Sequence, residues 1–373
     1  MKDLKKTSII AAKIVLSVGI IGWLFYKLVG TPKAWSAFVE MLQQPKAWGY
    51  LAVGFAFLLT IVLITMLRWW YLVRALGIDL SLPASLRIGF LGYFFNFAPT
   101  GIAGGDLLKA WLLAREKPRN RAKALASVIV DRIVGLYVLF LVATAGIFLT
   151  GFWQIAEPTV HWLCWLVIIL TLVSTAGLAL VLLPGFLEGP LVRGATRIPK
   201  VGDAIKSLID AMLVYRSKRL VLFLSSVMTI PVHVFLALCL ASLAMGLRFD
   251  RVPLGDYFTI YPVSGIAQTV PLPAGPAEMG IVFFYEQAWL RLPETKTELA
   301  RVAAAERPQK EQELKEAAGR EGLILALLYR LATILIVPIG AAYYFFGGRS
   351  EVAEVIHEEE GEEASEKLAP SVQ

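Results

Sequence analysis

The segment from Asn96 to Asp106 reads Asn96-Phe97-Ala98-Pro99-Thr100-Gly101-Ile102-Ala103-Gly104-Gly105-Asp106. It interrupts an apolar stretch with residues that break helices, because proline lacks a backbone donor and glycine disfavours helical structure. The segment from Gln268 to Glu278 has the same layout: an amide side chain, a proline three residues later, and a carboxylate seven residues after that proline. We interpret the two segments as paired breaks in membrane helices.

The composition predicts an all-α membrane protein. Of the 373 residues, 57% are hydrophobic and 17% are charged, whereas a soluble domain has about 25% charged residues. Several uncharged runs exceed the roughly 20 residues that cross a bilayer. These runs include 47–67, 158–187 and 220–247. We expect a polytopic helical bundle of about 6 full spans plus two re-entrant broken segments.

The formal net charge of +7 comes from short basic clusters between apolar runs. Such clusters orient a membrane protein, so we expect no nucleic-acid partner. Cys164 and Cys239 lie inside apolar runs without paired spacing, and the histidines are scattered. This pattern predicts neither a disulfide nor a metal site, and we expect no cofactor.

We expect the chain to begin in the cytoplasm with a retained signal-anchor helix at 8–28. Three lysines precede this helix and no small-residue cleavage site follows it. The second helix, at 47–76, returns to the cytoplasm and carries Arg68-Trp69-Trp70-Tyr71 near its inner end. We interpret this cluster as an aromatic belt with a snorkelling arginine at the membrane surface.

Two basic loops, one with its lysines and arginines between 109 and 123 and the other between 193 and 219, determine the topology of the first break. If the uncharged run 88–105 crossed the membrane, both loops would face outside, against the positive-inside rule. We therefore expect the run to enter from the cytoplasm, break at 99–105 and return. By the same reasoning, the run 257–290 enters from the outside and returns there. Further expected elements are spans at 124–153, 160–183, 220–247 and 321–346, and an amphipathic interfacial helix at 201–213.

These elements divide the chain into a transmembrane domain and a tail. The domain, 1–347, comprises half one at 47–183 and half two at 219–347, with an external charged insertion at 291–320 that resembles a solvated helix. The tail, 348–373, is acidic, and we expect it to be disordered and cytoplasmic.

The two halves form a predicted repeat. Val130-Asp131-Arg132-Ile133 matches Leu328-Tyr329-Arg330-Leu331, and the spacing from carboxylate to arginine is 26 residues in half one and 52 in half two. The insertion supplies about the difference. Because one break is entered from each side, the repeat would be inverted. In transporters, inverted repeats with paired broken segments place the substrate site near mid-membrane.

Ionisable residues inside a membrane are candidates for function, because each costs about 2.5–3.5 kcal/mol on insertion scales. The polar and charged residues at the breaks form our candidate substrate-binding set. The set is Asn96, Gly104, Gly105, Asp106, Lys109, Asp131, Arg132, Gln268, Glu278 and Arg330.

A structural interpretation stays open beside the functional one. Asp106 could pair with Arg132, and Glu278 with Arg330, only to hold each break against a neighbouring helix, with Asp106 as a helix cap. If a substrate binds, Lys109 and Arg132 suit a phosphate, while the carboxylates suit a cationic or sugar headgroup. No Walker loop or nucleophile elbow is present, so we expect no catalytic residue and no enzyme activity.

At these residues the chain resembles a flippase-like membrane family related to the transmembrane part of lysylphosphatidylglycerol synthase/flippase, the multiple peptide resistance factor. The matching features cover about 8–347: Arg68-Trp69, Asn96-x-x-Pro99 with Gly104-Gly105 and an acid, Asp131-Arg132, and the element from Pro273 to Glu278. The family's Gly-Gly-Glu followed by arginine is here Gly104-Gly105-Asp106 with Lys109. We expect no aminoacyl-transferase domain.

The resemblance implies an inner-membrane protein that moves a polar-headed lipid, such as an aminoacylated lipid, a glycolipid or a polyprenyl phosphate, between leaflets. Two alternatives stay open. One is an intramembrane enzyme of envelope lipid synthesis with Asp106 or Glu278 as general base, and the other is an accessory subunit of a partner synthase. A homo-oligomer is also open.

The orientation can be tested by amine labelling in sealed vesicles. The proposed topology requires Lys117 and Lys310 to be labelled from opposite sides of the membrane, because one follows the cytoplasmic hairpin and the other lies in the external insertion. Labelling of both lysines from one side would contradict the topology.

Overall fold

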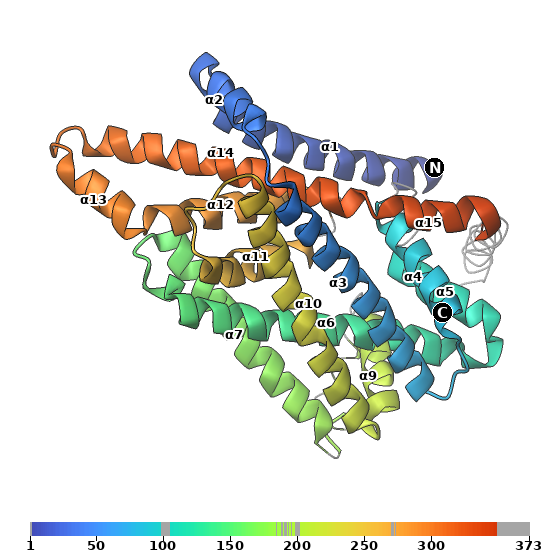
Figure 1. Ribbon diagram of the computed structural model, residues 1–373. Helices are drawn as coiled ribbons and strands as arrows, with labels where there is room; N and C mark the ends of the chain where they lie inside the picture. Colours follow the sequence, from blue (N-terminus) through green and yellow to red (C-terminus); the bar gives the residue numbers. More distant parts are fainter. Residues whose placement is uncertain are drawn as a thin grey trace. The chain divides into compact units, whose positions relative to one another are not determined.

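The computed structural model (Figure 1) describes residues 2–97, 105–183, 202–269 and 274–348, with 185–187, 189, 192, 194, 196, 197 and 272. These residues form helices and no strands, which confirms the predicted all-α fold. The α-helices are α1 (Lys2–Val29), α2 (Pro32–Gln43), α3 (Trp48–Ala75), α4 (Leu82–Phe97), α5 (Gly105–Glu116), α6 (Arg121–Thr150), α7 (Pro158–Leu182), α9 (Gly202–Arg216), α10 (Arg219–Gly246), α11 (Tyr257–Ile266), α12 (Pro276–Leu290), α13 (Pro293–Arg301), α14 (Arg307–Ile334) and α15 (Val337–Tyr343). Short 3-10 turns are η1 (Pro118–Asn120), η2 (Phe152–Gln154), η3 (Leu254–Asp256) and η4 (Ala267–Thr269), and a π-helical turn, η5, covers Tyr344–Gly348.

Five stretches of helix are long and apolar enough to cross a membrane. They are Trp48–Ala75, Arg121–Thr150, Pro158–Val181, Arg219–Gly246 and Arg307–Phe346. A sixth candidate is a bent pair, Val15–Val29 and Pro32–Gln43, whose helices meet at 100°. The chain is therefore a multi-pass membrane protein, with a span count close to the expected number.

The chain divides into two compact units. Unit 1 comprises Met1–Thr65, Ile133–Leu183 and Ser226–Thr333, and unit 2 comprises Met66–Arg132, Pro184–Ser225 and Ile334–Gln373. The helices that flank the first break, α4 and α5, belong to unit 2, and those that flank the second break, α11 and α12, belong to unit 1.

A pair of short, packed helices flanks each break. The helices α4, α5, α11 and α12 contain 16, 12, 10 and 15 residues, fewer than the roughly 20 that cross a bilayer. In unit 2, α4 packs along α5, and α15 packs against α4; in unit 1, α11 packs along α12 (Figure 1). Two short packed helices are the form that a re-entrant segment requires. The side from which each hairpin enters stays a prediction.

Glycines allow the two helices of each hairpin to touch. A Cβ atom on Gly105 would collide with the backbone carbonyl of Gly92 across the first hairpin. In the second hairpin, a Cβ on Gly280 would lie 2.9 Å from the Cα of Ser264. Backbones approach this closely in membranes only where side chains are absent, because helix association there depends on van der Waals packing.

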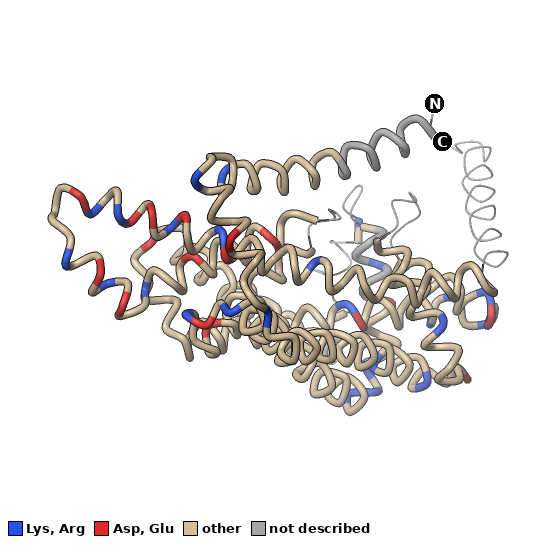
Figure 2. The backbone as a smooth tube through the Cα atoms, turned by 45° about the horizontal axis from the view of Figure 1, so that its top comes forward, with Lys and Arg blue, Asp and Glu red and all other residues tan. Residues whose placement is uncertain are grey.

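The charged segment 291–320 is helical, as expected. It forms α13 and the first half of α14, with an ion pair between the two helices, Lys310–Glu298 at 2.9 Å, and another within α14, Lys315–Glu311 at 2.7 Å. The last helix begins earlier than predicted, at Arg307 instead of near 321, because the Ala, Glu, Lys and Arg residues before 321 are strong helix formers. Arg330 consequently lies near the C-terminal end of α14, not in its first turns. Figure 2 shows how charges gather along this segment.

The hairpin packing predicts the effect of a single methyl group. Gly105→Ala should lower the free energy of unfolding by about 1–3 kcal/mol, because the new Cβ overpacks the contact with Gly92. The matched control is Gly177→Ala in α7, where a Cβ would meet nothing within 4 Å. Thermal unfolding in one detergent compares the two variants, and equal melting temperatures would contradict the close packing.

Candidate functional site

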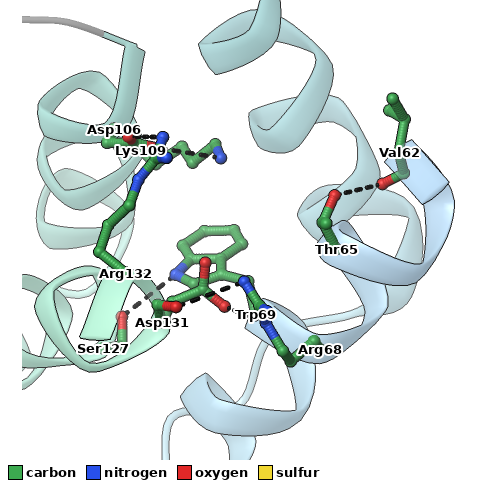
Figure 3. A network of polar contacts seen from close by, with 9 residues as sticks. All are labelled: Val62, Thr65, Arg68, Trp69, Asp106, Lys109, Ser127, Asp131 and Arg132. Atoms are coloured by element: carbon green, nitrogen blue, oxygen red, sulfur yellow. Dashed lines mark hydrogen bonds and ion pairs between the residues drawn. The ribbon is translucent and has the colours of Figure 1, made fainter. Parts of the chain in front are cut away.

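The first turn of α5 holds the carboxylate of the first break. Asp106 is the second residue of α5, where a negative charge is favourable near the positive end of the helix dipole. Lys109 donates from Nζ to Oδ1 of Asp106 at 3.2 Å, and Arg132 of α6 pairs with Oδ2 (Figure 3). This confirms the predicted pairing of Asp106 with Arg132. Both carboxylate oxygens are bound.

Arg68 takes part in the same group of charges, and its interpretation as a snorkelling residue at the membrane surface is wrong. Its side chain is 6% exposed, and its Nε donates to Oδ1 of Asp131 at 2.8 Å. The neighbouring Trp69 donates from its indole nitrogen to the Ser127 hydroxyl at 3.3 Å (Figure 3). The buried partner Asp131, one turn after Ser127 on α6, draws Arg68 into the protein instead of toward water.

We call Arg68, Asp106, Lys109, Asp131 and Arg132 the Asp106 cluster. Three cations and two carboxylates give it a formal charge of 3 − 2 = +1. Exposure of the side chains rises from 6% at Arg68 and 14% at Asp131 to 24% at Asp106 and 62% at Arg132. The cluster therefore has a buried pair and an accessible cation in one place.

The carboxylate of the second break is held differently. Glu278 is the third residue of α12, and its Oε2 accepts the backbone N–H of Gly275 at 2.7 Å, which caps the helix. Gly275 has a φ of 114°, a conformation that favours glycine. Oε1 of Glu278 accepts from Nε of Arg330 on α14 at 2.6 Å. The predicted pair of Glu278 and Arg330 is thus confirmed.

Beside this pair lies a small network of hydroxyl groups. Tyr329, which precedes Arg330, shares a hydrogen bond of 2.8 Å with Tyr261 of α11. Gln268, in η4, donates from Nε2 to the Tyr261 hydroxyl at 3.4 Å. The amide of the second break is therefore linked to both α11 and α14.

The two carboxylates differ most in exposure. The Glu278 side chain is 3% exposed and Arg330 is 22% exposed, whereas Asp106 and Arg132 are 24% and 62% exposed. A buried carboxylate that caps a helix and binds one arginine is a structural connection. An accessible arginine held by a shared carboxylate can also bind an anion from outside the protein.

The remaining predicted site residues lie outside these ion-pair networks. Asn96 is exposed near the end of α4, Gly105 is buried at the start of α5, and Gly104 lies outside the described residues. Asp106, Lys109, Asp131 and Arg132 come together as predicted from two helices, α5 and α6. Arg68, the tyrosine pair and Ser127 were not predicted as members of these networks.

Two further ion pairs close the open ends of the hairpins. Arg87 of α4 pairs with Glu116 of α5 at 2.7 Å, and Asp256 before α11 pairs with Arg291 after α12. Arg291 also donates to the carbonyl of Thr150 at 2.6 Å. Burial raises the pKa of Asp256, and the charge of Arg291 opposes this shift. Opposite charges on either side of each broken run were the available sequence signal for these pairs.

Comparison with known proteins gives a family for most of the chain. The family described as lysylphosphatidylglycerol synthase TM region matches residues 10–288. The matched range contains the whole Asp106 cluster and Glu278, and it ends before Arg330. No curated protein and no solved structure matches the chain.

The difference in exposure predicts unequal costs of removing each charge. Glu278→Gln should lower the free energy of unfolding by about 2–3 kcal/mol, because it leaves Arg330 largely buried without its carboxylate. Asp106→Asn should cost less than about 1 kcal/mol, because its partner Arg132 is 62% exposed and so is not buried without a counter-ion.

Thermal unfolding of both variants in the same detergent measures this difference. Since Asn and Gln keep the shape of the carboxylates, each variant removes the charge and little else. An Asp106→Asn loss as large as that of Glu278→Gln would contradict the distinction between an accessible and a structural carboxylate.

Proposed function

The chain belongs to the family of the lysylphosphatidylglycerol synthase TM region, and we propose that it moves a polar-headed lipid between the leaflets of the inner membrane. The observation that carries the proposal is the accessible Arg132 of α6, which pairs with Asp106 at the start of α5. The Arg132 side chain is 62% exposed on a helix of apolar composition, and an ionisable residue within a membrane helix is a candidate for function.

The cluster suits a headgroup that contains phosphate. Arginine offers a planar fork that binds two phosphate oxygens, and Lys109 adds a second cation one helical turn from Asp106. A phosphate that binds Arg132 would compete with Asp106, so binding exchanges one ion pair for another. Such an exchange costs less than moving an unpaired charge through an apolar environment.

The carboxylates add a preference among lipids. When a phosphate binds Arg132, Asp106 keeps Lys109 as its partner. The Asp106 oxygen that Arg132 has released can then accept a hydrogen bond from an amine or a sugar hydroxyl of the lipid. Aminoacylated phospholipids, glycolipids and polyprenyl phosphates each present a phosphate or a donor group to such a site. We propose these three classes as substrates.

The second break supports the same path in a structural role. Glu278 and Arg330 fix the start of α12 against α14, while Gln268 leaves an amide exposed at the tip. The N-terminus and the tail are cytoplasmic in this proposal, and the lipid leaves the protein chemically unchanged.

Translocation can be measured in proteoliposomes that contain labelled phosphatidylglycerol, lysyl-phosphatidylglycerol, a glycolipid or a polyprenyl phosphate. Arg132→Gln should slow transfer of the substrate lipid by about 10- to 100-fold, because it removes a charge-assisted contact worth about 1.5–3 kcal/mol. The matched control is Arg119→Gln, which removes one exposed charge from η1 in the neighbouring loop.

Two outcomes would contradict the proposal. One is a wild-type protein that accelerates the transfer of none of these lipids. The other is an Arg132→Gln variant as fast as Arg119→Gln. If an enzyme were present instead, mass spectrometry of the recovered lipid would reveal a changed product, whereas a transporter returns the lipid that was supplied.

A further inference from the structure

A cavity of about 590 Å³ lies where α9 ends and α10 begins, within unit 2. Its lining consists of Leu213, Arg216, Ser217, Arg219 and Leu220. We call this cavity the α9–α10 groove. It shares no residue with the Asp106 cluster, so it needs a separate account.

The polar side of the α9–α10 groove is cationic. Arg216 closes the last turn of α9, and Arg219 is the first residue of α10. Each arginine also has a partner within the chain, and the Ser217 hydroxyl lies between them in sequence. Among the described residues, none that lines the groove is acidic. Two guanidinium groups and a hydroxyl around one cavity match the oxygens of a phosphodiester.

The other side of the α9–α10 groove continues into an apolar stripe. Leu220, Phe223 and Leu224 are 68%, 62% and 38% exposed. Their spacing of i, i+3 and i+4 places them on one face of α10. Leu213 of α9, 37% exposed, joins them at the cavity. In a protein that spans a membrane, such a stripe faces acyl chains.

The charge and the apolar stripe together define the ligand. We infer that one anionic phospholipid occupies the α9–α10 groove, with its phosphate on Arg216 and Arg219 and an acyl chain along Leu220, Phe223 and Leu224. Basic pockets at the ends of membrane helices bind anionic headgroups in this way. The lipid is a bound component of the surrounding membrane and is not the transported substrate. The inference therefore does not depend on translocation.

Native mass spectrometry of the purified full chain tests the inference directly. The protein is titrated with phosphatidylglycerol or with phosphatidylcholine of the same acyl chains. The wild type should retain one phosphatidylglycerol in preference to phosphatidylcholine. Arg216→Gln combined with Arg219→Gln should weaken phosphatidylglycerol binding by at least about tenfold.

The matched control removes the same charge from the same region. Arg197→Gln combined with Lys206→Gln changes two exposed basic residues that do not line the groove, and should leave binding unchanged. Equal weakening in both double variants, or equal affinity of the wild type for the two lipids, would overturn the inference. Melting temperatures equal to that of the wild type show that each variant is folded.

Two additional arms separate a lipid from a free anion. Leu220→Asn with Phe223→Asn keeps both arginines and should also weaken phosphatidylglycerol binding, because the acyl chain loses its apolar contact. Inorganic phosphate in excess should not displace the lipid. Unchanged binding in the asparagine variant, or full displacement by phosphate, would overturn the assignment of a phospholipid.

Discussion

The ion pair between a carboxylate at the start of a helix and an arginine on the next long helix holds each broken segment in place. Backbone that is not helical is tolerated at membrane depth only where protein or trapped water satisfies its polar groups. Glu278 does this for the second break, because one oxygen caps α12 and the other binds Arg330. Asp106 binds Arg132 and Lys109 at the first break. Each carboxylate thus connects the first turn of a short helix to a long helix.

The same interaction has different consequences in the two units. Where the pair is buried, it has no capacity for another ligand, because both oxygens of Glu278 are occupied and Arg330 is mostly covered. Where the pair is accessible, the arginine can change partner. The buried pair of Arg68 and Asp131 lies beside the accessible one and supplies fixed charges around it. A site with a rigid part and an exchangeable part suits transient binding of a charged headgroup.

The sequence was sufficient to predict the class of fold, and it offered both carboxylate–arginine pairs as one of two interpretations of the charges at the breaks. The charges were informative because isolated charges in apolar runs need partners. The role of Arg68 could not be predicted, since a tryptophan-rich cluster near a helix end is typical of a membrane surface. Only the packing of α3 against α6 brings Asp131 to Arg68. The start of α14 was also misplaced, because composition marks the apolar span but not the helical residues that precede it.

The exposure of the two carboxylate–arginine pairs could not be predicted from the sequence. Asp106 and Glu278 occupy equivalent positions in the two broken segments, and nothing in their residue types distinguishes an accessible pair from a buried one. The difference follows from the surrounding packing, because the hydrogen-bonded side chains of Tyr261 and Tyr329 lie beside the second pair. The predicted inverted repeat is therefore compatible with unequal roles for its two halves.

The central claim is that Arg132 acts on the headgroup and is more than a counter-ion for Asp106. The most direct measurement is lipid translocation by the double variant Asp106→Asn with Arg132→Gln, compared with each single variant in the same proteoliposomes. If Arg132 binds the headgroup, the double variant stays as slow as Arg132→Gln. If Arg132 only neutralises Asp106, the double variant, which has no carboxylate to neutralise, transfers lipid as fast as Asp106→Asn. That result would contradict the account.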